Sequence, residues 1–198
     1  MRARFLLLAL AAGMLSGQQN GEAVSLYRQH RLVSPNGAYA LAGVAGRSEL
    51  LLEDERTRER TRVMGITVET MTVAWSPDSA AFLVNDRYAS DVECAYIYDT
   101  KTLERVDLGR LVENSIIGQE PKAARFLWDI NTGIHSYFDA MRWLDAQHVE
   151  LRLFGHTNGS PDAIPGECFD LRYRISRDGV VEKLSEHSAP IGVSECAG

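Results

Sequence analysis

The feature that most constrains this chain is an internal repeat with a period of about 42 residues. Residues 33–37 read Val-Ser-Pro-Asn-Gly, and residues 75–79 read Trp-Ser-Pro-Asp-Ser. A weaker third copy, Trp-Leu-Asp-Ala-Gln, occupies residues 143–147. A chain that repeats at such a period folds as a series of similar units, each of which buries its apolar surface against its neighbours.

Each copy predicts a turn followed by β-strands. Proline fixes one backbone angle of the turn, and the Asn or Asp side chain accepts a hydrogen bond within it. Alternating or apolar segments follow each turn at 39–42, 81–84 and 149–153. The copies also agree in phase, because Leu52, Ile97 and Ile175 each lie seven residues before a glutamate.

The second copy carries a resemblance to a known family. It reads Ala-Trp-Ser-Pro-Asp-Ser at 74–79, Ala-Phe-Leu-Val at 81–84 and Tyr-Ile-Tyr-Asp at 96–99. This pattern resembles the WD40-like repeats of the TolB-type β-propeller family and is cleanest at 74–106. In that family each copy is one four-stranded sheet, called a blade.

The resemblance implies an all-β fold, a propeller-like stack of about three antiparallel blade-like sheets. Propellers close their ring with four or more blades, and the chain shows three copies. We therefore expect an open or incomplete propeller. Two alternatives remain, a degenerate fourth unit within 111–141 or a second chain that completes the ring.

The first residues have the pattern of a secretory signal. Arg2 and Arg4 precede an apolar run at 5–12, and small residues follow it. We expect a signal peptide over 1–17 with an approximate end, since processing after Gly13, Gly17 or Ala23 fits the pattern. Residues 18–198 are then a single β-repeat domain, placed in the periplasm or secreted.

No segment after the signal shows a long helical period. The stretch at about 109–134 is predicted as an insertion between the second and third copies, with a short helix at Pro121–Trp128. Proline suits the first turn of a helix, which is why the predicted helix begins there.

Charge and motifs exclude several classes of protein. The chain has 21 Lys and Arg against 27 Asp and Glu, a net charge of −6, so we expect no nucleic-acid partner. No apolar run after the signal is long enough for a stable membrane span. The sequence lacks a nucleophile elbow, a phosphate loop and paired histidines, so we expect no cofactor, no metal and no enzymatic activity.

The longer connections are predicted to lie on one side of the stack. The turns at 34–37, 76–79 and 144–147 are tight, whereas the loops at 43–49, 85–93 and 155–167 and the insertion are longer. Because strand direction alternates, the longer loops emerge together, and variable loops on a rigid scaffold are a usual place for binding. The candidate partner-binding residues are Arg47, Arg87, Tyr88, Asp91, Trp128, His156, Asn158 and Asp162.

The three cysteines are Cys94, Cys168 and Cys196. In an oxidising compartment we expect one disulfide and one free thiol. A Cys168–Cys196 bridge is favoured slightly over Cys94–Cys168. Their spacing fits neither a zinc site nor a redox motif.

These observations together indicate an exported soluble binding protein, a monomer or a homodimer. We expect it to recognise another exported protein through the long loops. In one version of this hypothesis the partner protein is basic. Small periplasmic immunity proteins of type VI secretion systems are similar in size, export and β-rich repeats, which suggests an inhibitor or immunity protein. The alternatives are an enzyme of unknown type with its site at the same loops, or a structural subunit of an envelope assembly.

Overall fold

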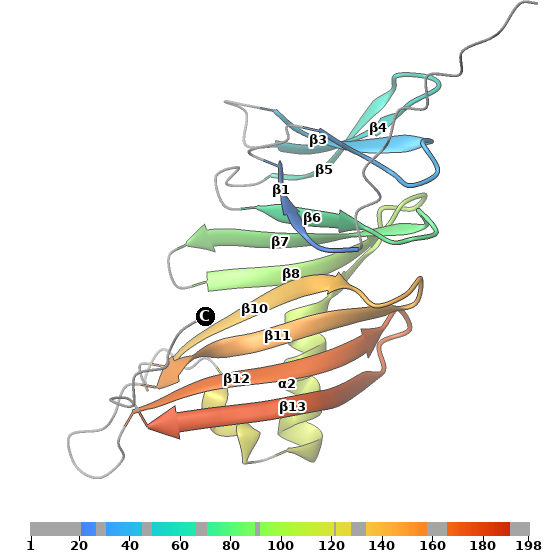
Figure 1. Ribbon diagram of the computed structural model, residues 1–198. Helices are drawn as coiled ribbons and strands as arrows, with labels where there is room; N and C mark the ends of the chain where they lie inside the picture. Colours follow the sequence, from blue (N-terminus) through green and yellow to red (C-terminus); the bar gives the residue numbers. More distant parts are fainter. Residues whose placement is uncertain are drawn as a thin grey trace, which may run out of the picture.

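The computed structural model describes residues 21–26, 31–44, 49–65, 71–89, 92–120, 122–127, 134–157 and 166–190. These residues form three antiparallel sheets stacked one on the next (Figure 1). The predicted all-β, propeller-like stack is therefore confirmed, and the described residues form no fourth sheet. The expected signal peptide lies outside the described residues.

Each sheet follows the order of the chain apart from one added strand. Sheet 1 consists of β2 (Arg31–Val33), β3 (Tyr39–Val44), β4 (Glu49–Asp54) and β5 (Arg60–Gly65). Sheet 2 consists of β1 (Val24–Ser25), β6 (Thr72–Trp75), β7 (Ala81–Ala89), β8 (Val92–Asp99) and β9 (Arg105–Asp107). Sheet 3 consists of β10 (Ile134–Trp143), β11 (His148–Thr157), β12 (Glu167–Ser176) and β13 (Val181–Pro190).

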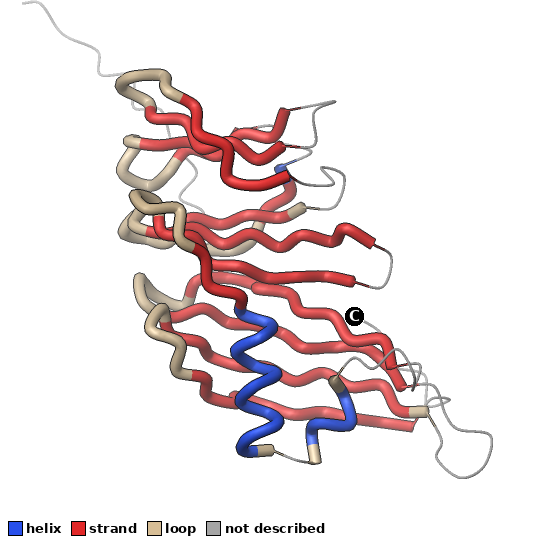
Figure 2. The backbone as a smooth tube through the Cα atoms, turned by 180° about the vertical axis from the view of Figure 1, so that it is seen from behind, coloured by secondary structure: helices blue, strands red, loops and turns tan. Residues whose placement is uncertain are grey.

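The serines of the first two repeats close the tight turns. Ser34 Oγ accepts a hydrogen bond from the Tyr39 amide at 3.0 Å, and Ser76 Oγ accepts the Ala81 amide at 2.9 Å. These turns and the other short connections lie together at one end of the three sheets (Figure 2). The local chemistry of the repeat thus fixes where each second strand begins.

The tryptophans of the second and third repeats join successive sheets. Trp75 Nε1 donates to the Leu32 carbonyl at 3.0 Å, and Trp143 Nε1 donates to the Ala74 carbonyl at 3.2 Å. Both indoles are buried and pack in the inter-sheet cores. In the first repeat Val33 takes this place and is 45% exposed, since sheet 1 begins the stack.

Sheet 2 lies between two apolar cores. Toward sheet 1, Phe82 stacks on Tyr98 at 5.3 Å and meets the edge of Trp75 at the same centroid distance. Toward sheet 3, Leu83 and Ile97 belong to a core that includes the buried side of that sheet. Apolar side chains on both faces require a neighbouring sheet on each side.

One helix corrects the sequence reading. Helix α2 spans Leu108–Gln119, at the start of the predicted insertion, while the described part of the predicted helix, 122–127, holds a 3-10 turn, η1 (Ala123–Phe126). Asp107 caps α2 by accepting the Arg110 amide at 3.0 Å. The helix lies against sheet 3 (Figure 2), and its buried residues are four, Leu108, Gly109, Val112 and Ile116. Within the described ranges no helix is long and apolar enough to cross a membrane.

The segment before β1 fastens sheet 2 to sheet 3. Strand β1 pairs with β6, while the Ala23 amide donates to the Met141 carbonyl at 3.0 Å and the Trp143 amide donates to Gly21 at 2.9 Å. Gly21 has φ +74°, and a Cβ there would lie 2.8 Å from the Trp143 carbonyl oxygen. Glycine is therefore required by both backbone angle and space.

We expect Gly21→Ala to destabilise the protein more than the matched change Gly37→Ala. Both glycines have positive φ, but a Cβ at Gly37 meets nothing within 4 Å. Gly37→Ala should therefore cost only the left-handed backbone penalty, about 1–2 kcal/mol, whereas Gly21→Ala adds a clash with the main chain. Urea denaturation of the two variants measures the difference, and equal losses would contradict this account.

Candidate functional site on the open face of sheet 3

One face of sheet 3 packs on the core, and the other carries polar and aromatic side chains. The register places Tyr137 opposite Phe154, Asp139 opposite Arg152, and Arg152 opposite Arg172, so their side chains share the face that points away from the core. We call this surface the open face of sheet 3. Its members are Tyr137, Asp139, Arg142, Glu150, Arg152, Phe154, His156, Asp170 and Arg172.

Arginine and aromatic side chains stack on the open face. The rings of Tyr137 and Phe154 are stacked with centroids 5.3 Å apart. The Arg152 guanidinium lies 4.4 Å from the Phe154 ring centre, and Arg87 reaches from β7 to 5.9 Å from the Tyr137 ring. Cations at these distances interact favourably with the ring faces, so each ring of the aromatic pair has a guanidinium group over it.

A buried carboxylate organises one side of the face. Glu150 Oε2 accepts from Arg142 Nε at 2.9 Å, and Glu150 Oε1 accepts from Arg172 Nη1 at 3.2 Å. The Glu150 side chain is only 6% exposed, whereas Arg142 and Arg172 are 49% and 41% exposed. A buried carboxylate requires such partners, and in return it fixes the orientation of both arginines.

Asn85 joins the site to sheet 2. Its Nδ2 donates to Asp139 Oδ1 at 2.8 Å and to the Ala140 carbonyl at 2.9 Å, and its Oδ1 accepts the Ala140 amide at 2.8 Å. The ladder between β10 and β11 shifts just after Ala140. Burial raises the pKa of Asp139, while the nearby charges of Arg152 and Arg87 oppose that rise.

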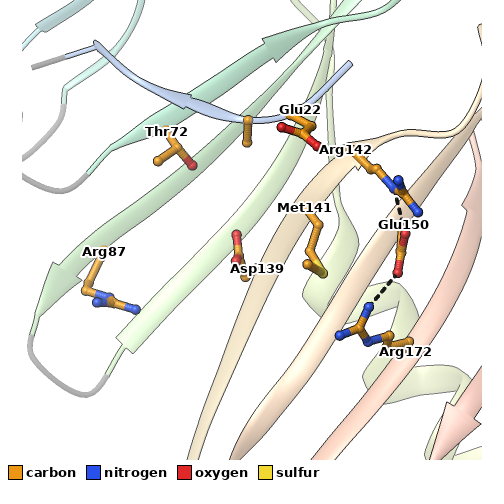
Figure 3. Close-up of a pocket in the computed structure, with 9 residues that line it drawn as sticks. Glu22, Thr72, Arg87, Asp139, Met141, Arg142, Glu150 and Arg172 are labelled. Atoms are coloured by element: carbon orange, nitrogen blue, oxygen red, sulfur yellow. Dashed lines mark hydrogen bonds and ion pairs between the residues drawn. The ribbon is translucent and has the colours of Figure 1, made fainter. Parts of the chain in front are cut away.

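A pocket of about 560 Å³ lies where sheet 2, sheet 3 and the N-terminal segment meet. Figure 3 shows Arg142 and Arg172 reaching Glu150 from two sides, with Arg87 on the far side of Asp139. The lining residues are Glu22, Ala23, Thr72, Arg87, Asp139, Met141, Arg142, Glu150 and Arg172.

The lining chemistry suits recognition of charged groups. The lining residues that the structure describes include no serine, cysteine or histidine, and the Thr72 hydroxyl accepts from Asn85 Nδ2 at 2.9 Å. Glu150 is bound by two guanidinium groups. Among the residues with a described placement, no group of three or more His, Cys, Asp or Glu could hold a metal ion.

The structure brings two of the predicted binding residues to this region. His156 shares the open face, two residues beyond Phe154 on β11, and Arg87 lines the pocket. Tyr88 lies in β7 beside Arg87, and its side chain is outside the described part of the chain. The other predicted residues, Arg47, Asp91, Trp128, Asn158 and Asp162, also fall outside the described residues.

The prediction of a loop at 85–93 is wrong. Strand β7 continues to Ala89 and β8 begins at Val92. The polar run that begins at Asn85 resembles a loop in sequence, but Asn85 is 1% exposed because it hydrogen-bonds to sheet 3. A contact with a distant sheet thus explains a polar residue inside a strand.

Sequence reasoning missed most of the open face. Glu150, Arg152 and Phe154 alternate with buried leucines on β11, and Asp170 and Arg172 alternate in the same way on β12. The available signal was this alternation, in which a charged or aromatic residue stands at every second position of the strand. It shows which residues share a face, and the stacking of the sheets decides which face is open.

Of the cysteines, Cys94 is free and lies opposite Asp86 in the register of β7 and β8. Burial raises the pKa of its thiol. Cys196 falls outside the described residues, so the Cys168–Cys196 bridge stays a prediction.

Comparison with known proteins finds only partial, distant similarities to solved structures. No family model and no curated protein matches the chain. TolB from Acinetobacter baumannii is 15% identical, with a TM-score of 0.37, over 79% of this chain and 32% of TolB. The tricorn protease is 12% identical, with a TM-score of 0.44, over 82% of this chain and 17% of the protease. Pyrococcus horikoshii acylaminoacyl peptidase is 11% identical, with a TM-score of 0.37, over 78% of this chain and 23% of the peptidase. The chain spans less than a third of each.

We expect Asp139→Asn to change how stability depends on pH. Because the folded pKa is raised above its ordinary value of 3.8, the contribution of Asp139 is fully present below that value and is lost as the pH rises through the folded pKa. The stability of the natural protein relative to the variant should therefore fall from pH 3.5 to pH 7.

Asp145→Asn is the matched control, since hydrogen bonds from the Gln147 amide and from His148 lower the pKa of Asp145. Its contribution is present above the ordinary pKa and is lost as the pH falls, so the trend has the opposite sign. Urea denaturation across this pH range measures both variants. Parallel trends would contradict the assignment.

Proposed function

We propose that this chain is an exported binding protein that recognises a partner protein through the open face of sheet 3 and the adjoining pocket. The observation that supports this most is the group of partly exposed arginines stacked on Tyr137 and Phe154. Arginine, tyrosine and other aromatic residues are enriched in the centres of protein interfaces.

The open face is also organised before any partner arrives. Ion pairs hold Arg142 and Arg172 on Glu150, and Arg152 Nη2 lies 2.8 Å from Asp170 Oδ2. Ordering a flexible side chain at an interface costs about 0.5–1.5 kcal/mol. Side chains that are already ordered by the fold avoid part of that cost.

The alternatives find less support in the geometry. An enzyme would need a nucleophile or a general base in the pocket. Of the lining carboxylates, Glu150 and Asp139 are engaged by Arg142, Arg172 and Asn85, while Glu22 is exposed on the N-terminal segment. A subunit that completes a ring would need apolar outer faces. Sheet 1 instead presents an ion-pair cluster around Glu53, formed with Arg31, Arg58 and Arg60.

Export to the periplasm or the medium belongs to the same proposal. The backbone pairing of Gly21 and Ala23 with β10 would be lost if processing occurred after Ala23. Processing after Gly13 or Gly17 leaves the fold intact. The most specific version is an inhibitor or immunity protein, and an equimolar mixing assay against exported enzymes of the same cell tests that version separately.

The main experiment is affinity capture of the mature domain, tagged at its C-terminus, from its own exported compartment. We expect one stoichiometric partner that is lost with Phe154→Ala, because that change removes the ring beneath Arg152 and beside Tyr137. Arg62→Ala, on sheet 1 and 63% exposed, is the matched control and should retain the partner. Retention by both variants, or no partner at all, would overturn the proposal.

We also infer the Cys168–Cys196 bridge, because Cys94 is free. In the chain-entropy model a bridge across a loop of this length contributes about 3–4 kcal/mol. Thiol titration of the denatured, unreduced protein should give one thiol per chain. Three thiols would show that no bridge forms.

A further inference from the structure

We propose that the carboxylates of Asp86, Asp107 and Glu113 keep the free thiol of Cys94 protonated, so that Cys94 does not take part in thiol–disulfide exchange. This inference is independent of the proposed function. It assigns a chemical role to a second pocket beside α2 and to a buried carboxylate that the open face does not use.

The second pocket has a volume of about 250 Å³ and lies where β8, α2 and β10 meet. Strand β9 leads directly into α2 at this place (Figure 2). Cys94 of β8 lines the pocket together with Asp107, the last residue of β9, and Glu113 within α2. Phe138 of β10 supplies a buried apolar wall. The free thiol therefore shares one small space with two carboxylates.

A third carboxylate lies directly across from the thiol. The register of β7 and β8 pairs Asp86 with Cys94, so both side chains point to the same face of sheet 2. Asp86 is 6% exposed, and its Oδ1 has no hydrogen-bond partner among the residues that the structure describes. Burial raises the pKa of this carboxyl. A thiolate beside it would add a second negative charge where the first is already poorly stabilised.

Glu113 lies in a similar environment. It is half-buried, and within the described ranges it forms no ion pair. Burial raises its pKa, the charge of Asp107 raises it further, and Arg110 opposes that rise. Asp107 accepts the Arg110 amide as the cap of α2, so the helix fixes the place of this carboxylate beside Glu113.

The nearby cations do not reverse the effect on the thiol. Arg110 lines the same pocket, and the Arg105 guanidinium lies 5.0 Å from the centre of the Tyr96 ring. Burial raises the pKa of the Cys94 thiol most, a hydrogen bond with Tyr96 lowers it, and the three carboxylates raise it, so that the balance is a raised pKa. The thiolate is the form that attacks disulfides. A thiol with few thiolates in equilibrium therefore exchanges slowly.

The fold also separates Cys94 from Cys168. Neighbouring residues of a strand point to opposite faces, and Phe169 packs in the core of sheet 3, so Cys168 lies on the side of the open face. Cys94 shares its pocket with Phe138, which belongs to the same core as Phe169. Sheet 3 therefore lies between the two sulfur atoms, which disfavours a bridge between them in the folded chain.

The test measures alkylation of Cys94 in the full chain by iodoacetamide from pH 6 to pH 10. The thiolate displaces iodide from this uncharged reagent, so the rate follows the thiolate fraction. Mass spectrometry of the peptide that contains Cys94 gives the rate in the folded protein and in urea. We expect the rate of the folded protein to rise at higher pH than that of the denatured protein, whose thiol has an ordinary pKa of about 8.5.

Three variants of nearly unchanged shape remove the charges one at a time. Glu113→Gln, Asp107→Asn and Asp86→Asn should each speed alkylation of the folded protein about threefold at pH 8, because a thiol pKa lower by about 0.5 gives about threefold more thiolate. Asparagine caps a helix about as well as aspartate, so α2 keeps its place. Glu182→Gln, on β13 and 59% exposed, is the matched control and should leave the rate unchanged.

The variants separate charge from two other causes of a slow reaction. Shielding of the sulfur from the reagent would slow alkylation equally at every pH. Desolvation alone would shift the pH dependence without any response to the three variants. The inference is overturned if the folded and denatured proteins share one pH dependence, if the three variants react like the natural protein, or if Glu182→Gln speeds the reaction as much as they do.

Discussion

Sheet 2 carries buried apolar side chains on both faces, and the rest of the structure depends on covering them. Val73 and Phe82 belong to the core toward sheet 1, while Ala74 and Leu83 belong to the core toward sheet 3. A single sheet of this kind would expose one face to water, at a cost proportional to its apolar area. The stack therefore needs a sheet on each side of sheet 2.

In the stack that the described residues form, each outer sheet has one charged face. Glu53 and Glu150 are buried on the outer faces of sheets 1 and 3, and each is held by arginines of its own sheet. Repeat proteins commonly need end units with polar outer surfaces to remain soluble. An apolar sheet placed against either cluster would remove water from ion pairs, which is unfavourable unless new partners replace it. The outer faces of the three described sheets are therefore suited to contact with water.

The sequence predicted what the repeat itself determines. The predicted turns at 34–37 and 76–79 form, and in them the side chains of Asn36 and Asp78 accept the amides of Ala38 and Ala80, because these roles follow from local spacing. It did not predict α2, whose buried period is short and includes Gly109. There, a Cβ would lie 3.1 Å from the Phe138 ring. A glycine is needed at position 109 because of this contact with sheet 3. The local sequence pattern does not reveal such contacts.

The candidate site could be predicted only in part for the same reason. His156 and Arg87 were found because they lie near strand ends, whereas Glu150 and Arg172 required knowledge of which face of sheet 3 is open. Charged residues that end a stack remain hydrated and discourage the packing of another sheet. When arginines lie on aromatic rings, the same surface also offers apolar area and directed donors to a partner of matching shape and charge. A face that ends the stack is thereby suited to binding, since solubility and recognition use the same side chains.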